Sequence, residues 1–364
     1  MSKKVLIVQR VLTSYRFELL QELAPTVEQL DFVTSQGDTQ GTLKSYKPEK
    51  IKYKNIKIHT LNAFRFGYSG DSRSTSLFFY PQILKLLKNY DTIVLEGTTN
   101  LLNNILIVPF AKILGKKVLW WDAGYSLETR TLKRKLIDSV VSIFIRITDG
   151  QLAYSTKAKN YMQTYMGARN CHLLLNTINT EYFETIQSEI HKNIDNYTYD
   201  PGNIKLLYVG AVEKRKKIKE LIDIVIKSNN EGKKFTLTII GGGPYLDFLK
   251  QYVLDNAIDY IRFTGPIYDK KKLKDYYFNA DLFVLPGDGG LGLLQSLLYG
   301  LPTVCTAADG TEEDYIASNM ILENIEKFTQ FDFSKIHSLF DYNTLYTKVN
   351  SNNFIKKLSE IIDA

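Results

Sequence analysis

Short apolar runs alternate with longer segments of helical period along most of the chain. Because the runs are apolar at successive positions and helical segments separate them, the pattern predicts parallel sheets covered by helices on both faces. In the first half the predicted strands are 5–10, 30–35, 56–61, 92–97, 117–124, 151–155 and 171–176. In the second half they are 205–210, 235–244, 260–265, 281–287 and 303–307, with predicted helices at 218–231, 245–257, 270–279 and 292–299.

The alternation is interrupted once, between 184 and 204, where the chain is polar and contains Asp200-Pro201-Gly202. We interpret this segment as an interdomain linker because it shows no clean period. The chain of 364 residues is long enough for two domains. We therefore expect doubly wound α/β domains at 1–183 and 205–345, and a C-terminal helix over 346–364 that packs back on the first domain. Such domains bind ligands at the carboxyl ends of their strands.

The net charge of +7 and the pI near 9.0 permit three partners: nucleic acid, an anionic membrane surface or phosphorylated small molecules. Nucleic acid is the least favoured, because basic and acidic residues are interspersed and no basic arm or zinc finger is present. Cys171 and Cys305 lie far apart in apolar runs, which indicates a reducing compartment without disulfides or a zinc site. No apolar run approaches the length of a membrane span, so we expect a cytoplasmic or peripheral protein.

Four cations, 214–217, follow Gly210 and lead into a predicted helix. Cations beside a helix N-terminus oppose its dipole and destabilise it unless an anion lies among them. We therefore predict that Arg215 and Lys216 grip a diphosphate. The alternative is an ordinary solvated loop.

The stretch LFVLPGDGGLGLLQSLLYGLPTV, 282–304, concentrates glycine at the start of a predicted helix. Backbone N–H groups at Gly289, Gly290 and Gly292 would suit phosphate oxygens without any charged side chain. Gly300 would cap the helix before Pro302. The alternative role, glycine needed only for helix–strand packing, explains Gly300 but not the cluster at 287–292.

The order of these features resembles the C-terminal domain of GT-B glycosyltransferases, specifically the large retaining family 4. The matching positions there are Gly210, Lys216, Gly241, Gly243, Pro244, Phe263, Gly265, Pro286, 289–292 and 300–304. In the first half they are Tyr15-Arg16, 95–97, 120–124 and 153–180. The resemblance implies a GT-B fold, in which two Rossmann-like domains face each other across a cleft.

The resemblance further implies transfer of a sugar from a UDP- or GDP-linked donor to a hydroxyl group. The expected acceptor is a glycan or a polyprenyl-diphosphate-linked sugar in bacterial surface polysaccharide synthesis, such as capsule, O-antigen or exopolysaccharide. No metal or other cofactor is expected, since no Asp-x-Asp pair ends a strand.

The resemblance also carries a set of site residues. The donor would be bound by Gly210, Gly243, Pro266, Ile267, Tyr268, Gly289, Gly290, Leu291, Gly292, Glu313 and Asp314. The acceptor would be bound by Tyr15, Arg16, Glu96 and Trp121. Catalysis would fall to Lys216, Arg215, Gln295 and, if the reaction inverts, Asp122 as the base.

The chain departs from the family pattern where the family has two glutamates with seven residues between them. Those positions are Gly287 and Gln295 here. The chain resembles the subset in which backbone amides replace the first carboxylate. The family favours retention, in which the leaving phosphate takes the acceptor's proton, whereas inversion needs a carboxylate base such as Asp122. Asp122 could equally be a cap or turn residue.

Three other departures concern single positions. Ala211 stands where the family has arginine, and Lys217 stands where it has glycine. Ala123 stands at the position of a family histidine.

Two further functions stay open: a non-catalytic or impaired protein that binds a nucleotide sugar, and a GT-B sugar-nucleotide epimerase. The epimerase is less favoured because none of the four histidines ends a predicted strand. An NAD-dependent oxidoreductase is excluded, since no Gly-x-Gly-x-x-Gly follows the first strand. The helix predicted over 133–147 begins with cations and has an apolar body. It is either a core helix or a foot on anionic lipid.

Overall fold

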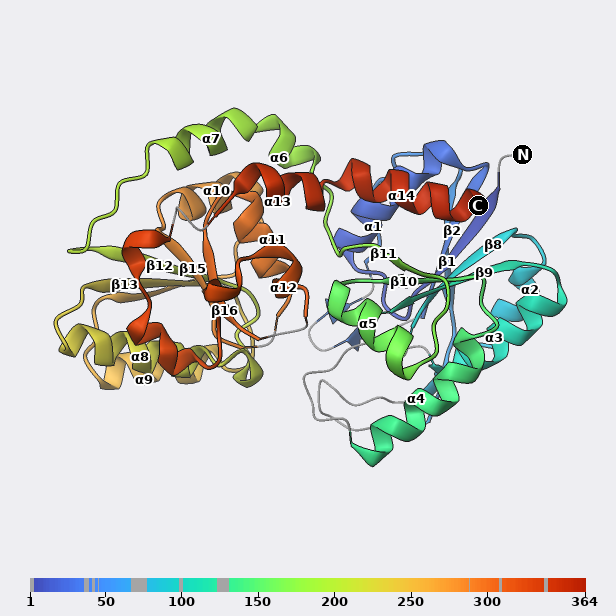
Figure 1. The fold of residues 1–364 in the computed structure, drawn as a ribbon, viewed down its shortest axis with the longest axis horizontal. Helices are drawn as coiled ribbons and strands as arrows, with labels where there is room; N and C mark the ends of the chain where they lie inside the picture. Colours follow the sequence, from blue (N-terminus) through green and yellow to red (C-terminus); the bar gives the residue numbers. More distant parts are fainter. Residues whose placement is uncertain are drawn as a thin grey trace. The chain divides into compact units, whose positions relative to one another are not determined.

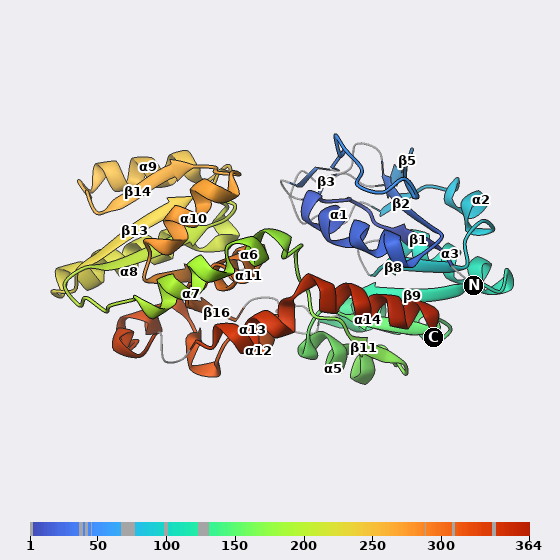
Figure 2. The ribbon, with the colours of Figure 1, turned by 90° about the horizontal axis from the view of Figure 1, so that it is seen from above.

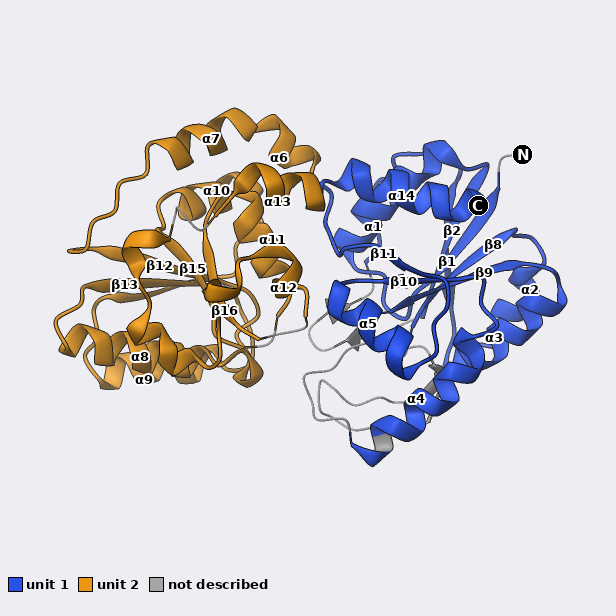
Figure 3. Cartoon of the chain, viewed as in Figure 1, with its two compact units in different colours: residues 1–179, 349–364 blue, residues 180–348 orange. Residues whose placement is uncertain are grey.

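The computed structural model describes residues 3–35, 39–40, 43–44, 46–66, 77–97, 101–122, 131–287, 289–307, 310–336 and 340–364. The chain divides into two compact units (Figure 3). Unit 1 comprises residues 1–179 and 349–364, and unit 2 comprises residues 180–348. Each unit is built on its own parallel sheet, of seven strands in unit 1 and six in unit 2. The predicted α/β class with doubly wound sheets is confirmed.

The seven-stranded sheet of unit 1 has the order β11-β10-β9-β8-β1-β2-β5. Its strands are β1 (Lys4–Val8), β2 (Gln29–Ser35), β5 (Ile56–Leu61), β8 (Thr92–Glu96), β9 (Lys117–Asp122), β10 (Gly150–Ala153) and β11 (Cys171–Leu173). Two short antiparallel pairs lie outside it: β3 (Thr39–Gln40) with β4 (Leu43–Lys44), and β6 (Phe64–Phe66) with β7 (Leu77–Phe79). The apolar alternation did not predict these pairs.

Helices cover both faces of this sheet (Figures 1 and 2). One face carries α1 (Ser14–Leu20), a 3₁₀ turn (Gln21–Thr26) and α14 (Ser351–Asp363). The other carries α2 (Ile83–Leu87), α3 (Leu101–Ile113), α4 (Leu132–Ile145) and α5 (Thr156–Tyr165). Since both faces are covered, strands β1, β8, β9 and β10 are buried over nearly their whole length.

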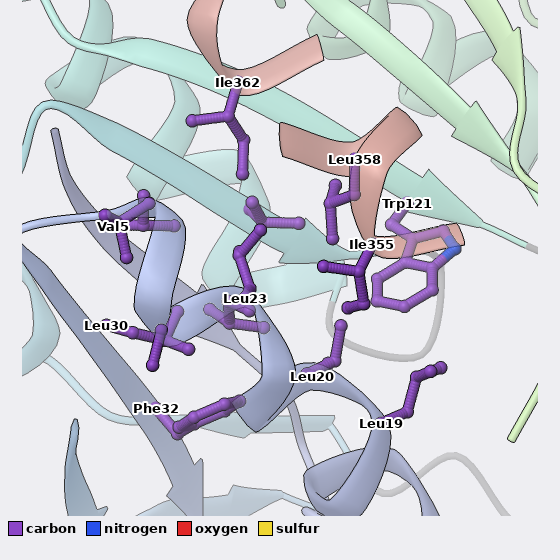
Figure 4. Close-up of a cluster of buried hydrophobic side chains, with 14 of the residues drawn as sticks. Val5, Leu19, Leu20, Leu23, Leu30, Phe32, Trp121, Ile355, Leu358 and Ile362 are labelled. Atoms are coloured by element: carbon purple, nitrogen blue, oxygen red, sulfur yellow. The ribbon is translucent and has the colours of Figure 1, made fainter. Parts of the chain in front are cut away.

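Helix α14 completes the core of unit 1 although it lies at the far end of the chain. Asn350 caps its N-terminus, and its buried residues repeat at helical spacing. Leu358 and Ile362 are fully buried among Leu20, Leu23 and Trp121 (Figure 4). A large apolar area is removed from water at this contact, so α14 belongs energetically to unit 1.

A buried polar cluster lies on β2, within the same unit. Oδ2 of Asp31 accepts hydrogen bonds from the Tyr90 hydroxyl and from Gln29, and it contacts Nε2 of His59 at 2.7 Å. Burial raises the pKa of Asp31, but the bonds from His59, Tyr90 and Gln29 outweigh it and leave the pKa below its usual value. The cluster therefore holds Asp31 as a carboxylate.

The six-stranded sheet of unit 2 has the order β14-β13-β12-β15-β16-β17. Its strands are β12 (Ile204–Val209), β13 (Phe235–Ile240), β14 (Ile261–Gly265), β15 (Leu282–Leu285), β16 (Thr303–Thr306) and β17 (Ile321–Leu322). The helices are α6 (Glu181–Thr185), α7 (Gln187–Asp195), α8 (Ile218–Asn230), α9 (Leu246–Asp255), α10 (Lys270–Phe278), α11 (Leu291–Leu298), α12 (Glu312–Tyr315) and α13 (Tyr342–Val349). Short 3₁₀ turns occupy Lys214–Lys216, Ser318–Met320, Ile325–Gln330 and Phe333–Lys335.

The segment 184–204, interpreted above as a linker, differs from that interpretation. It contains all of α7 and the end of α6, and it belongs to unit 2. The apolar side of α7 consists of only two residues, Ile190 and Ile194. The sequence of this segment therefore shows little hydrophobic periodicity. Those two side chains approach Gly300, where an added Cβ would lie 2.8 Å from Ile190 and 2.9 Å from Ile194. Tertiary packing on Gly300 therefore stabilises a helix that the local pattern did not reveal.

Among the residues that the structure describes, no helix is long and apolar enough to cross a membrane.

Candidate functional site

The carboxyl ends of β12, β13 and β15 meet at one edge of the unit 2 sheet, because these strands are parallel. The loops that follow them, 210–217, 241–245 and the described residues 286–287 and 289–290, pack on one another. The N–H of Val212 donates to the carbonyl of Gly242 at 2.9 Å, and the N–H of Tyr245 donates to the carbonyl of Val212 at 3.1 Å. Three loops from separate parts of the chain thus form one rigid surface at the edge where doubly wound folds bind ligands.

Lys216 lies at the centre of this surface. It ends the 3₁₀ turn that follows β12, it is only 7% exposed, and its Nζ donates to the carbonyl of Gly289 at 2.7 Å. A Cβ added to Gly290 would lie 3.6 Å from the same Nζ. The structure therefore brings together the lysine and the glycine loop that the sequence analysis assigned to the donor diphosphate.

Arg215 is oriented by Glu213, an acid that the sequence analysis did not single out. Nε of Arg215 lies 2.5 Å from Oε2 of Glu213, whose side chain is almost fully buried. A buried carboxylate that pairs with an arginine fixes the position of the guanidinium. The signal in the sequence was an acid immediately before the run of cations.

Lys217 caps α8 in the left-handed conformation, with φ 52° and ψ 35°. This is one of two positive-φ residues other than glycine in the described part of the chain. Glycine adopts this conformation without steric cost. Lysine at this position, where the family has glycine, therefore strains the backbone, because a residue with a Cβ is disfavoured in the left-handed region.

Two glycines of the loop are explained by packing, which corrects the expectation that packing accounts only for Gly300. A Cβ on Gly287 would lie 2.6 Å from the carbonyl oxygen of Arg215, and a Cβ on Gly292 would lie 2.7 Å from that of Val209. Both distances are shorter than real contacts allow. These glycines let the end of β15 and the start of α11 approach the backbone of β12 and of the loop that follows it.

Gly290 and Gly243 have a different requirement. Their φ angles are 154° and 155°, values that favour glycine. An added Cβ on Gly243 would lie 2.4 Å from the carbonyl of Val212, whereas one on Gly290 would meet only the Lys216 amine within 4 Å. Gly290 is the N-cap of α11. The space that a side chain would occupy there is open and lies beside the Lys216 amine.

The other predicted donor residues lie around this surface. Pro266 packs on Gly242, with its ring 3.7 Å from an added Cβ, and Tyr268 is 88% exposed. Gln295 is half-buried on α11. Also at this edge, Gly210 follows β12, Ile267 follows β14, and Leu291 begins α11.

Glu313 and Asp314 line a cavity of about 250 Å³ together with Phe340, Asp341 and Lys348. The glycine loop does not contribute to that lining. Their neighbour Glu312 is fully buried instead, and its Oε2 accepts the N–H of Gly310 at 2.9 Å. The sequence analysis assigned Glu313 and Asp314 to donor binding. The structure adds 312 as the acid that faces the loop after β16.

In unit 1 the predicted acceptor residues gather at the carboxyl ends of β8 and β9. Arg16, on α1, lies over the ring of Trp121 at 4.4 Å, and Tyr154 and Tyr15 are 5.1 and 5.4 Å away. One Nη of Arg16 donates to the Tyr154 hydroxyl at 3.2 Å. Tyr154 was missed as a site residue, although it lies at the end of the predicted strand 151–155 and directly follows the observed β10.

The Arg16 guanidinium is buried, and Nη1 has no hydrogen-bond partner among the described protein atoms. Burial lowers the pKa of Arg16, but the neighbouring Tyr154, Tyr15 and Glu96 outweigh it, so the pKa is raised and the group stays charged. A buried cation with an unused donor is a binding group for an anion or a polar oxygen.

Trp121 is 1% exposed and packs on Phe354 of α14, with 5.9 Å between ring centroids. It lies in the hydrophobic core (Figure 4). Through its contact with Arg16 it helps to position that guanidinium; its predicted contact with the acceptor stays a prediction.

The two acids at this edge both accept hydrogen bonds; Asp122 is buried and Glu96 is half-buried. Glu96 accepts the N–H of Arg10 at 2.6 Å, and Oδ2 of Asp122 accepts the Trp120 indole N–H at 3.1 Å. The Asp122 carboxyl also packs closely on the backbone of Gly97. Ala123, the family's histidine position, lies outside the described residues.

Within the described parts of the chain, no three His, Cys, Asp or Glu side chains are grouped so that they could hold a metal ion. Independence of metal stays a prediction.

Comparison with known proteins gives a family and a fold. Residues 189–323, most of unit 2, match the family described as Glycosyl transferases group 1. An alpha-monoglucosyldiacylglycerol synthase from Streptococcus pneumoniae is 23% identical over 268 residues, which are 70% of this chain and 58% of the synthase. The chain thus spans less than two thirds of that relative.

Two solved structures share the fold over 99% of both chains. One is Anabaena Alr3699/HepE in complex with UDP, at a TM-score of 0.70 and 12% identity. The other is the lipopolysaccharide outer core galactosyltransferase WaaB, at a TM-score of 0.67 and 15% identity. These matches confirm the predicted resemblance: the chain has the GT-B fold, and residues 189–323 of its second unit match the glycosyl transferases group 1 family.

Proposed function

We propose that this GT-B chain, with a group 1 domain in unit 2, transfers a sugar from a nucleotide-diphosphate sugar to a hydroxyl group of an acceptor. The observation that carries the proposal is the 2.7 Å contact of the buried Lys216 amine with the Gly289 carbonyl, beside Gly290. It assembles a cation and a helix N-terminus at one point. Such a pair suits the diphosphate of a leaving nucleotide.

Lys216 and Arg215 would neutralise the charge that develops on the β-phosphate as the sugar–oxygen bond breaks. The N-terminus of α11 adds N–H dipoles at the same place. We propose the retaining route, in which the departing phosphate oxygen accepts the acceptor's proton. No enzymic base is then needed, in keeping with Gly287 and Gln295 at the family's glutamate positions.

The inverting alternative would need a carboxylate base, for which Asp122 is the candidate. Asp122 already accepts the Trp120 N–H and is only 6% exposed. These contacts favour a structural role and so favour retention.

UDP is the first nucleotide to test, since the HepE structure of the same fold holds UDP. For the acceptor we propose a glycan or a lipid-linked sugar bound by unit 1 in bacterial surface polysaccharide synthesis. Two names support this acceptor class: that of the synthase, whose product is an alpha-monoglucosyldiacylglycerol, and that of WaaB, a lipopolysaccharide outer core galactosyltransferase. Arg16 would provide the anion-binding group.

The test is a donor screen by thermal unfolding, followed by product detection. A nucleotide at 100 times its Kd stabilises the protein by about 2.7 kcal/mol, which raises the Tm by roughly 5–10 °C. UDP, GDP and their common sugar conjugates would be screened, and the stabilising donor incubated with glycan and lipid-linked acceptors. Transfer detected by mass spectrometry supports the proposal. Tight binding without transfer or hydrolysis would instead support the non-catalytic alternative, and an interconverted donor the epimerase.

A further inference from the structure

Helix α4 exposes an apolar stripe to solvent. Leu132, Leu136 and Ile143 are 83%, 69% and 63% exposed, and Ile147 follows just beyond the end of the helix. Their spacing of four, seven and four residues places them on one side of the helix. The opposite side is buried on the sheet through Val141 and Ile145. The helix is therefore apolar on its buried side and also along its solvent side.

Helix α3 lies beside α4 and has the same property (Figure 1). Its exposed large apolar residues are Leu106, Phe110, Ile113 and Leu114, and Ile113 is 82% exposed. Both helices bury their other sides in one core cluster. Their outward sides therefore face solvent on the same side of the sheet. We call the eight exposed residues the α3–α4 apolar surface.

The charges around this surface are predominantly positive, although Lys112 is paired with the exposed Asp149, with 2.7 Å between Nζ and Oδ1. Between 101–122 and 131–147 the only acids are Asp122 and Asp138, and both are buried. Lys135 and Arg146 are exposed beside the α4 stripe, and Lys112 and Lys116 lie near the end of α3. Exposed apolar side chains flanked by cations are the composition of a helix that lies in the interface of an anionic bilayer.

We propose that the α3–α4 apolar surface docks unit 1 on an anionic lipid bilayer. The apolar side chains would enter the headgroup–acyl boundary, while the lysines and Arg146 meet the lipid phosphates. The helices would lie on the membrane rather than cross it, as their length requires. A second copy of the chain fits less well, because a two-fold contact would bring the same cations against each other.

The test is co-sedimentation of the intact chain with vesicles of phosphatidylcholine alone and of equal parts phosphatidylcholine and phosphatidylglycerol. We expect binding to the anionic vesicles that weakens as salt is raised. Leu136→Glu and Ile143→Glu should each reduce binding by about tenfold or more. The matched control is Leu254→Glu on α9 of unit 2, where Leu254 is 71% exposed; it should leave binding unchanged.

Lys135→Glu combined with Arg146→Glu should reduce binding to anionic vesicles without touching the apolar residues. Unfolding curves of every variant check the fold. Failure of the wild-type chain to bind, or equal binding by Leu136→Glu, would overturn the proposal. So would a dimer in solution that Leu136→Glu dissociates while vesicle binding is absent. Nucleotide stabilisation, measured on the same samples, separates this outcome from failure of the proposed transferase activity.

Discussion

Replacing Lys216 with methionine tests the proposed diphosphate site most directly. Methionine keeps an unbranched, buried side chain and removes only the charged amine. In the structure Lys216 is buried, with only 7% of the residue exposed to solvent. The hydrogen bond of 2.7 Å to the Gly289 carbonyl holds the amine at the glycine loop. This is the place where we propose that it contacts a phosphate of the donor.

The expected loss can be estimated from this geometry. A charge pair about 4 Å apart at an effective dielectric constant near 20 interacts by about 4 kcal/mol. Removal of one preorganised donor to a developing oxyanion costs about 2.7–4 kcal/mol in measured cases, which is roughly 10²–10³ in kcat. The folded state should lose only about 1 kcal/mol, because the half-buried Gly289 carbonyl can take a water in place of the amine.

The assay is initial-rate release of the nucleoside diphosphate with the donor found in the screen, alongside thermal unfolding. The control is Lys214→Met, the same substitution at an exposed residue of the same 3₁₀ turn. We expect the control to retain wild-type turnover. If Lys216→Met also turns over within about threefold of wild type, a difference of well under 1 kcal/mol, the assignment of Lys216 to the leaving phosphate is wrong.

Three further predictions concern packing and charge. Gly292→Ala should lower the free energy of unfolding by about 1–3 kcal/mol and weaken nucleotide binding, because the new Cβ would lie 2.7 Å from a backbone oxygen. The control is Gly242→Ala, whose Cβ would make only ordinary contacts of 3.7 Å. In the same unfolding and binding titrations the control should show a smaller loss. Leu358→Ala should destabilise unit 1 by about 2–5 kcal/mol in urea unfolding, since this fully buried residue anchors α14, and a loss below about 1 kcal/mol would show that α14 is not part of that core. The pKa of Asp31 is lower in the folded protein than in the unfolded chain, so its carboxylate stabilises the fold above the unfolded pKa near 3.9, and this contribution is lost as the pH falls through the lower folded pKa. The difference in Tm between wild type and Asp31→Asn should therefore shrink as acid is added. A difference in Tm that stays constant would contradict the stabilising role of the Asp31 carboxylate.

The alternation of apolar runs and helical segments was enough to predict both parallel sheets. Every predicted strand has a counterpart in the structure, with ends that differ by a few residues at most. The strand-end positions of Lys216 and the glycine loop followed from the same pattern, since the carboxyl ends of parallel strands share one edge, whereas Arg16 was assigned through the family resemblance. Such features depend on local period and on chain order, and a single sequence records both.

Contacts between distant segments were decided only in the tertiary structure. Gly287 and Gly292 are needed because β15 and α11 approach backbone more than seventy residues earlier in the chain. Tyr154 joins Arg16 across 138 residues, and α7 forms because Gly300 leaves room for its two isoleucines.

The exposure of α3 and α4 belongs to the same class. An apolar residue has the same place in the pattern whether it faces the sheet or the solvent, so the sequence alone could not separate a core helix from a membrane foot. The structure shows that α4 has a buried apolar side, which packs on the sheet, and an exposed apolar side, which faces solvent. The sheet can cover only one side of a helix that is apolar around much of its circumference. Local periodicity determines which elements form. Which of their faces are buried is a property of the neighbours that the fold brings to them.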